Sequence, residues 1–299
     1  MSRLHPPSQA ADPVLLTLLL LASMFLVGAV GQAQGAPAGR SVSAGSVEPM
    51  GPPPGVLRVC ADPDNLPFSD STGGGFENKL AALLGAETGR TVSYTWWPQR
   101  RGFVRNTLRA HECDVLLGVP SDFDPVAATT PYYRSTYYLV SRRDRALGLR
   151  SLDDPKLRRL RIAVNVIGED YTNTPPAHAL GERGIVAARG YDTFYNAERR
   201  PGDIVDAVVK GDVDVAVVWG PLAGYFARRA GVPLDMVALP DSDALTGLPF
   251  AYDIALGVRR RDRAFRGELE GALQRRQADV GRLLAEYGFP TLAAPARAP

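Results

Sequence analysis

The sequence predicts an α/β protein of two lobes, each a mainly parallel sheet flanked by helices, joined by a two-stranded hinge. Three stretches carry this prediction, because each runs an apolar strand straight into a turn: LRVCADPDNLPFS (57–69), CDVLLGVP (113–120) and DVDVAVVWGP (212–221). Ligands of open α/β sheets bind just past the carboxyl ends of the strands. These strand ends therefore predict a cleft, and function is to be sought there.

The first lobe alternates strands and helices from residue 56 onward. Apolar runs predict strands over 57–61 and 91–96 on either side of a helix over 76–87, whose leucines have helical spacing. A second helix over 102–110 leads to a continuous apolar strand over 114–118, typical of a parallel strand covered on both faces. Three parallel strands are therefore expected in this lobe.

The second lobe repeats the scheme. Strands are expected over 160–166 and 213–218, and helices over 176–183 and 203–210. Extended sequence over 137–141 and 252–258 predicts two chain crossings between the lobes. Helical sequence over 264–287 follows the second crossing. The expected boundaries are lobe 1 at 56–140 with 255–292 returning to it, lobe 2 at 141–254, and a tail at 293–299. A chain that leaves one lobe, builds another and returns indicates ligand capture by closure of a clamshell.

Composition limits the class of protein. With 299 residues, 45% of them hydrophobic and 22% charged, the chain can bury one sizeable core or two smaller ones. The net charge is +2 and no long Lys/Arg block is present, so a nucleic acid partner is not expected.

The N-terminal residues read as an export signal. The 17-residue apolar run 14–30 follows a short polar stretch with Arg3 and precedes small residues ending at Ala33, which predicts a secretory signal over 1–33. An uncleaved membrane anchor is the alternative. Residues 34–55, rich in Gly, Ala, Ser and Pro, are expected to form a flexible linker. No Cys follows the apolar run, so a lipoprotein is disfavoured and the mature protein is expected to be periplasmic and free of the membrane after cleavage.

Two cysteines lie in or beside candidate strands. Export places Cys60 and Cys113 in an oxidising compartment, where they are expected to form one disulfide, the alternative being two buried thiols. The only histidines, His5, His111 and His178, lack ligand spacing to a Cys. A metal site, thiol catalysis and a cofactor are therefore not expected.

Six motifs, in order along the chain, carry a family resemblance. They are LRVCADPDNLPFS, GFENKLAALL, YTWWPQRRGFVRNTL, CDVLLGVP, YTNTPPAHAL and VDVAVVWGPLAGYFA. Over residues 56–292 the chain resembles the type II periplasmic solute-binding proteins, and more narrowly the methanol dehydrogenase accessory proteins of MxaJ and XoxJ type. The resemblance implies a periplasmic protein that acts beside a PQQ-dependent alcohol dehydrogenase, in its maturation or activation.

The sequence departs from the amino-acid-binding relatives at two anchors. Those relatives place an Arg after the third strand of lobe 1 to grip a carboxylate, where this chain has Ser121 to Pro125. They also place an Asp after the last strand of lobe 2 to bind the α-ammonium, where this chain has Trp219, Gly220 and Pro221. A standard amino acid is therefore not the expected ligand.

Candidate ligand contacts follow the strand ends, and each has a structural alternative. Asp62 and Asn65 could be turn residues, Phe68 a lid over the core, and Glu77 a complement to a helix N-terminus. Adjacent Trp96 and Trp97 point to opposite faces of a strand, so one is expected in the core. The candidate set is Asp62, Asn65, Phe68, Trp97, Arg100, Gly118, Pro120, Asn165, Gly168, Asp170, Tyr171, Trp219 and Gly220.

Several of these candidates have competing interpretations. Arg100 could simply be solvated, Trp219 could be a core residue that fills the gap between the lobes, and the loop with Asn165 could be the start of a capped helix. Gly220 allows a close backbone approach. Acidic residues such as Asp122 and Asp124 lack calcium-loop spacing and are expected to be solvated.

Three functions compete at this stage. The first is an accessory protein that docks on a quinoprotein dehydrogenase and holds a protein segment or small factor in its cleft. The second is a substrate-binding protein of an ABC importer for a small solute other than an amino acid. The third, an enzyme of the cyclohexadienyl dehydratase kind, needs a positioned acid or base and is the least favoured because no His lies in a predicted cleft loop.

Overall fold

A computed structural model describes residues 51–167, 172–186, 189–193, 195–196 and 198–293. The predicted signal and all but the end of the linker lie outside these residues, as do Gly168, Asp170 and Tyr171. Within the described part, no helix is long and apolar enough to cross a membrane.

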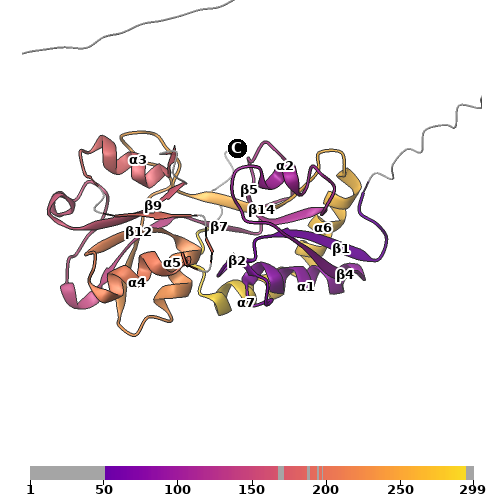
Figure 1. Cartoon of the computed structure of the whole chain (residues 1–299), viewed down its shortest axis with the longest axis horizontal. Helices are drawn as coiled ribbons and strands as arrows, with labels where there is room; N and C mark the ends of the chain where they lie inside the picture. The colour runs from indigo at the N-terminus through magenta and orange to yellow at the C-terminus, as the bar shows by residue number, and fades with distance from the viewer. Residues whose placement is uncertain (1–50, 168–171, 187–188, 194, 197, 294–299) are drawn as a thin grey trace, which may run out of the picture. The chain divides into compact units, whose positions relative to one another are not determined.

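The first sheet has the strand order β4-β1-β5-β14-β6, with β7 paired to β14 (Figure 1). Strand β1 is parallel to both β4 and β5, and β14 is antiparallel to β5, so the three predicted parallel strands are present. The strands are β1 (Val56–Ala61), β4 (Thr91–Trp96), β5 (Val115–Pro120), β6 (Ala127–Ala128), β7 (Tyr133–Ser135) and β14 (Tyr252–Val258), with a separate hairpin of β2 (Asp64–Asn65) and β3 (Ser69–Asp70).

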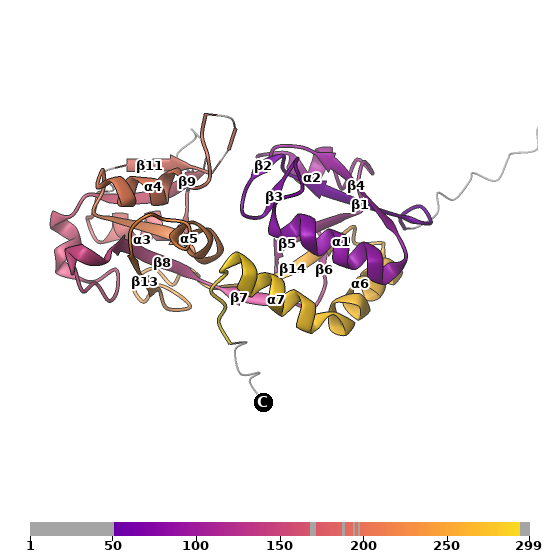
Figure 2. The same ribbon diagram turned by 90° about the horizontal axis from the view of Figure 1, so that it is seen from below.

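Helices cover both faces of this sheet. Helices α1, α6 and α7 pack on one face, where Leu57, Leu80 and Leu269 are fully buried in the larger core (Figure 2). The short helix α2 and its following turns cover the other face through a smaller cluster that includes Phe103 and Leu108. The bounds are α1 (Phe76–Thr88), α2 (Phe103–Asn106), α6 (Arg263–Arg275) and α7 (Gln277–Tyr287).

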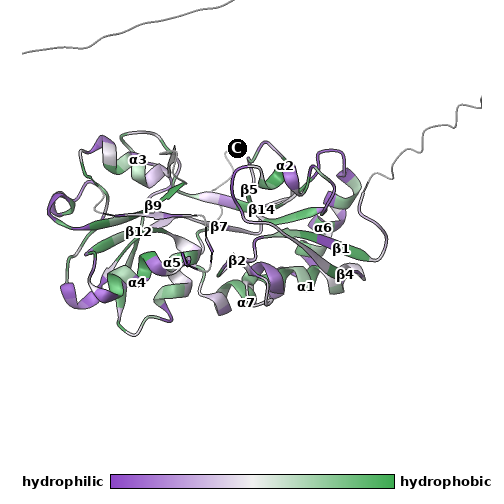
Figure 3. Cartoon of the chain, in the orientation of Figure 1, coloured by the Kyte–Doolittle hydropathy of each residue, from purple (hydrophilic) through white to green (hydrophobic). Residues whose placement is uncertain are grey.

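The second sheet repeats this plan with the order β10-β9-β12-β8-β13, and β11 pairs with β9. Its apolar strands are covered by α3 on one face and by α4 and α5 on the other (Figure 3). The strands are β8 (Tyr137–Arg142), β9 (Ile162–Ile167), β10 (Thr172–Asn173), β11 (Arg189–Asp192), β12 (Val215–Trp219) and β13 (Leu234–Ala238). The helices are α3 (Pro175–Glu182), α4 (Asp203–Lys210) and α5 (Gly220–Ala227), with 3-10 turns at Arg143–Arg145 and Pro155–Arg159.

The chain crosses between the two sheets twice. It leaves the first sheet after β7, which ends at Ser135, and enters the second with β8, which starts at Tyr137. It returns at β14, which starts at Tyr252. Both crossing segments therefore continue into regular strands, and by strand pairing the second sheet starts before residue 140 and the first resumes before residue 255.

Two expected helices differ from the structure. The helix expected over 102–110 ends at Asn106, because Thr107 has φ of −120° and ψ of −82°, outside the helical region. The helical segment expected over 264–287 is divided at Arg276, whose φ of −103° and ψ of 16° separate α6 from α7.

Each lobe carries the same Arg–Asp pair just before its central strand. Asp114 precedes β5 and accepts hydrogen bonds from Arg58 Nε at 2.7 Å and Nη2 at 2.8 Å. Asp214 precedes β12 and accepts from Arg161 Nε at 3.1 Å and Nη2 at 3.0 Å. Each Asp has a second arginine partner: Arg259, 10% exposed, donates to Asp114 at 2.6 Å, whereas Arg145, 46% exposed, donates to Asp214 at 3.0 Å. The repeated ion pair fixes the start of each central strand, and it is tighter in lobe 1.

The predicted disulfide between Cys60 and Cys113 is confirmed, with the two Cα atoms 5.4 Å apart. Cys60 lies near the end of β1 and Cys113 lies two residues before β5. Both sulfur-bearing residues belong to the small cluster under α2, beside Phe103 and Leu108. The bridge therefore joins the strands that carry the predicted cleft to the segment that covers them.

Candidate functional site

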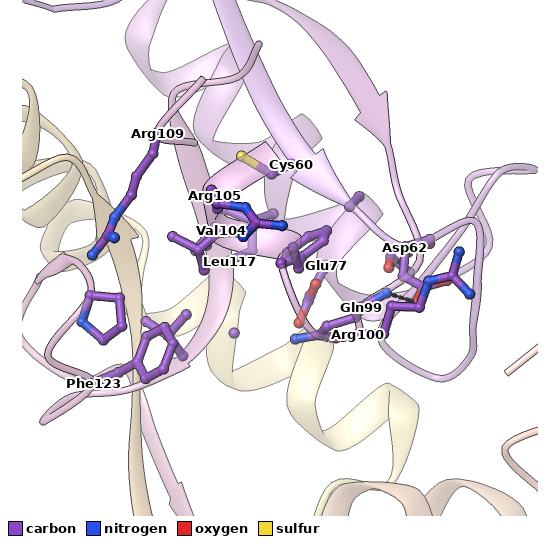
Figure 4. A pocket seen from close by; sticks show the side chains of 18 of the residues that line it. Cys60, Asp62, Glu77, Gln99, Arg100, Val104, Arg105, Arg109, Leu117 and Phe123 are labelled. Carbon is purple, nitrogen blue, oxygen red and sulfur yellow. Dashed lines mark hydrogen bonds between the residues drawn. The ribbon is translucent and has the colours of Figure 1, made fainter. Parts of the chain in front are cut away.

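A cavity of about 490 Å³ lies in lobe 1, where β1 and β5 end (Figure 4). Its lining comes entirely from residues 60–125. Three of the predicted site residues, Asp62, Arg100 and Gly118, line it. The cavity is within the usual size range of small-molecule sites.

Asp62 is held by the backbone on both sides. Its Oδ1 accepts from the Asp64 N–H at 2.9 Å and its Oδ2 accepts from the Gln99 N–H at 2.5 Å. Burial raises the pKa of Asp62, and the two hydrogen bonds oppose this by stabilising the charged form. Asp62 is therefore a turn residue as well as a cavity residue, because its carboxylate ties the β1–β2 turn to the loop after β4.

Glu77 lines the cavity, a position that its sequence context did not indicate. It is the second residue of α1, and Figure 4 shows its carboxylate pointing into the cavity. A Cβ built on Gly118 would lie 2.3 Å from Glu77 Oε1, so the glycine makes room for the carboxylate. Among the described residues, no hydrogen bond or ion pair to this carboxylate is found.

The environment of Glu77 disfavours its charge. Burial, and then the neighbouring Asp62, raise its pKa to about 7. A helix N-terminus acts in the opposite direction, so burial outweighs the stabilisation expected from the sequence. A carboxyl that titrates near neutral pH can present either a donor or a charge to a ligand.

Glu77 is expected to make the protein less stable as the pH rises. A folded pKa of about 7, above the unfolded value of 4.5, gives stability that is complete below pH 4.5 and is lost as the pH rises through 7. The full effect is at most about 3 kcal/mol. Urea unfolding at pH 5 and pH 8 should show a smaller difference for Glu77→Gln than for the unchanged protein, and equal differences would contradict the buried environment.

Basic and apolar side chains complete the cavity. Arg100, Arg101, Arg105 and Arg109 all line it, as do apolar residues that include Phe103, Leu117 and Phe123. The arginines come from a single segment, the loop after β4 and the turns around α2. Gln99, Arg105 and Arg109 were not predicted as site residues, because nothing in their spacing distinguishes them from solvated residues of a short helix.

Other predicted residues of lobe 1 lie outside the cavity. Asn65 donates through Nδ2 to Gln99 Oε1 at 3.0 Å and so supports the same loop as Asp62. The Phe68 ring lies 5.7 Å from that of Phe289 and packs against the core, as expected for a lid over the core. Trp97 is 37% exposed, whereas Trp96 stacks on Tyr94, and Pro120 pairs with Ile254 in the sheet.

Trp219 closes the end of β12 with an aromatic cluster. Its ring centroid lies 5.3 Å from that of Tyr137 and 5.8 Å from that of Tyr252. A Cβ built on Gly220 would lie 2.5 Å from Ser135 Oγ, so glycine is required where α5 begins beside the crossing segment. The indole is thus held between residues of both sheets, as the core alternative described.

Asn165 lines a separate cavity of about 420 Å³ in lobe 2, together with Tyr191 and Tyr195. Its backbone carbonyl accepts from Thr174 Oγ1 at 2.7 Å, and Thr174 is the residue before α3. The rest of the predicted loop lies outside the described residues.

Comparison with known proteins identifies close relatives, although no family model matches. The chain is 31% identical to Protein MoxJ of Methylorubrum extorquens over 294 residues, 95% of each protein. It is 36% identical to the crystal structure of the periplasmic binding protein XoxJ from Methylobacterium extorquens AM1, with a TM-score of 0.65 over 80% of this chain and all of that one.

A second solved structure supports the same grouping. MxaJ from Methlophaga aminisulfidivorans MPT is 26% identical, with a TM-score of 0.67 over 79% of this chain and all of that one. An ancestral cationic amino acid solute binding protein, at 21% identity and a TM-score of 0.60 over 78% of this chain and 96% of that one, shares the fold alone. The expected two-lobed type II periplasmic binding protein fold is thus confirmed, and the chain belongs to the family of the periplasmic binding proteins MoxJ, XoxJ and MxaJ.

Proposed function

We propose that the protein is a periplasmic accessory protein of a PQQ-dependent methanol or alcohol dehydrogenase and acts in its maturation or activation. It does so by binding the dehydrogenase, or a small factor, in the cleft between its lobes. Family membership over 95% of the chain supports this, together with the resemblance of its motifs to the methanol dehydrogenase accessory proteins. A cleaved N-terminal signal is part of the proposal, since the protein must reach the periplasm.

One observation separates this function from transport of a standard amino acid. The end of β12 presents the Trp219 indole, held by Tyr137 and Tyr252, where an amino acid receptor needs a carboxylate for the α-ammonium. The indole, partly buried between two tyrosines, supplies an apolar aromatic group there in place of a charge, and aromatic groups are common at protein interfaces.

The docking surface is proposed to include Trp97 and Arg100. Trp97 is 37% exposed, and its backbone N–H donates to the Ala61 carbonyl, so its side chain can be removed without disturbing β1. Arg100 has no ion pair with a described residue that would be lost.

Changing Trp97 and Arg100 together to Ala is expected to abolish recovery of the dehydrogenase. The mature chain from Gln34 is used as bait in periplasmic extract of methanol-grown cells, and the recovered proteins are identified by mass spectrometry. Binding of the purified dehydrogenase is then tested with the same bait. Arg261→Ala, an exposed arginine of lobe 1 away from the cavity, is the matched control. No dehydrogenase bound to the unchanged protein would refute the accessory function, whereas binding retained by the double variant would refute only the surface.

The alternative is a substrate-binding protein of an ABC importer, and the cavity of about 490 Å³ favours it. A transported solute should stabilise the protein by about 2.7 kcal/mol at a hundredfold excess over its Kd. Recovery of a permease, with no dehydrogenase, would decide for this alternative.

We further propose that the protein is not an enzyme. Glu77 provides a carboxyl that can exchange a proton, but proton transfer to a substrate also needs a positioned partner. Its neighbour Asp62 has both carboxylate oxygens engaged by backbone N–H donors. The described lining of the cavity also holds no His and no free thiol that could be such a partner.

A further inference from the structure

Three arginines at the cavity form no ion pair with a described residue. Most other arginines of lobe 1 are paired, as Arg58 is with Asp114 and Arg90 with Glu268. Arg100, Arg105 and Arg109 are exposed and form no ion pair with any residue that the structure describes. A guanidinium binds carboxylate through two parallel hydrogen bonds, so unpaired guanidinium groups around a cavity favour an anionic ligand.

The three guanidinium groups are spread along the cavity. Figure 4 shows Arg100 at the end formed by Asp62 and Gln99, Arg109 beside Phe123 at the other end, and Arg105 between them. A ligand with one carboxylate could reach only part of this set. The arrangement favours a ligand whose carboxylates are distributed around its edge.

Apolar side chains line the cavity together with the arginines. They include Phe103, Leu117, Val119 and Phe123. Aromatic side chains pack favourably on other flat rings, and guanidinium planes also stack on them. The body of the ligand is therefore expected to be flat and apolar rather than a hydrated chain.

The two acidic side chains at the cavity affect an anion differently. The Asp62 carboxylate accepts two backbone N–H bonds, which offset part of its charge, and it repels an anion that comes close to it. Glu77, with no partner among the described residues, can present an O–H donor when it is protonated. Its position over Gly118 places that donor inside the cavity.

We propose that the lobe 1 cavity binds a small aromatic polycarboxylate, whose carboxylates pair with Arg100, Arg105 and Arg109 while protonated Glu77 donates a hydrogen bond to it. This proposal rests on the proposed function, because it names the chemical class of the small factor, and it assigns the contacts that lobe 1 makes with that factor. It requires no contact with the dehydrogenase and can be tested on the purified protein.

Ligand binding is coupled to the proton on Glu77. The pKa of Glu77 is already raised to about 7, and an anion in the cavity raises it further. Affinity therefore falls as the pH rises through and above 7. The titratable and charged groups that face Glu77 or line its cavity are Asp62 from the β1–β2 turn, Tyr94 from β4, Tyr132 and Tyr133 before and in β7, and the four arginines Arg100, Arg101, Arg105 and Arg109.

The experiment is isothermal titration of the mature protein with benzene-1,3,5-tricarboxylate at pH 6 and pH 8.5. Three comparison ligands are titrated in the same way. Citrate has three carboxylates without a ring, inorganic phosphate has charge alone, and the benzene triamide has the ring without charge. The variants are Arg105→Gln with Arg109→Gln, Glu77→Gln, and Arg261→Gln as an exposed control outside the cavity. Arg100 is left unchanged because it belongs to the proposed docking surface.

The tricarboxylate is expected to bind at pH 6 more tightly than citrate, phosphate or the triamide. Its affinity should fall roughly 30-fold by pH 8.5, the loss expected for a required proton on a group with a pKa of 7. Glu77→Gln should bind with little pH dependence, because an amide donates at both pH values. The paired arginine variant should bind at least tenfold more weakly, and Arg261→Gln should be unchanged.

No binding of the tricarboxylate at pH 6, equal binding of phosphate, or unchanged affinity in the arginine variant would each overturn the proposal. Recovery of the dehydrogenase is measured separately. If the dehydrogenase binds but the tricarboxylate does not, the ligand class is wrong and the accessory function stands. If the tricarboxylate binds but the dehydrogenase does not, the ligand class is right and the accessory function is wrong.

Discussion

Replacing Asp114 by Asn is expected to destabilise the protein by about 3–5 kcal/mol, the usual effect of breaking a buried ion pair. The Asp114 side chain is fully buried, and it accepts from both Arg58 and Arg259. The neutral amide leaves the guanidinium of Arg259, only 10% exposed, with Asp262 as its remaining buried counter-charge, and it leaves Arg58 without its carboxylate partner. Chemical unfolding followed by circular dichroism gives the difference directly.

Asp214→Asn provides the matched control, since Asp214 has the same position in lobe 2. Its main partner Arg161 is 52% exposed, so water can solvate the guanidinium once the charge is lost. The expected cost is about 1 kcal/mol. Equal effects at the two positions would show that burial does not decide the strength of these pairs. An effect larger at Asp214 would contradict the assignment of Asp114 as the tighter anchor.

These paired anchors also show what the sequence can and cannot reveal. Hydrophobic spacing located most strands and helices, because a strand covered on both faces must be apolar throughout, as in 114–118. The helix after β4 was predicted too long, since the helix ends at the backbone angles of Thr107, and no Gly or Pro in the sequence marks that position.

The cavity was harder to predict than the fold. Asp62, Arg100 and Gly118 were found because they follow strands or sit at their ends. Glu77 received the more ordinary interpretation, a charge at a helix N-terminus, because its burial depends on Gly118, distant in the sequence. Arg105 and Arg109 lie in turns, where nothing local separates a cavity residue from a solvated one. Residue spacing alone therefore does not identify site residues whose role depends on contacts between segments that are distant in the sequence.

Removing the disulfide by Cys60→Ser with Cys113→Ser is expected to destabilise the protein by about 4 kcal/mol. The cysteines are 53 residues apart, and closing a loop of that length limits the entropy of the unfolded chain by about this amount. For a protein of this size the loss corresponds to a fall in Tm of roughly 8–16 °C. Differential scanning calorimetry of the mature chain measures it.

Reductant distinguishes the bond from the substituted side chains. Dithiothreitol should lower the Tm of the unchanged protein toward that of the double variant and leave the variant's own Tm unaltered. An unchanged Tm, with two thiols released per chain, would show that packing of the small cluster under α2 holds the segment without the bond. Because Cys60 lines the cavity and Cys113 anchors the turns that carry Arg105 and Arg109, loss of the bridge should also weaken binding of benzene-1,3,5-tricarboxylate. A fall in Tm with unchanged affinity would instead mean that the bridge stabilises lobe 1 without positioning these arginines.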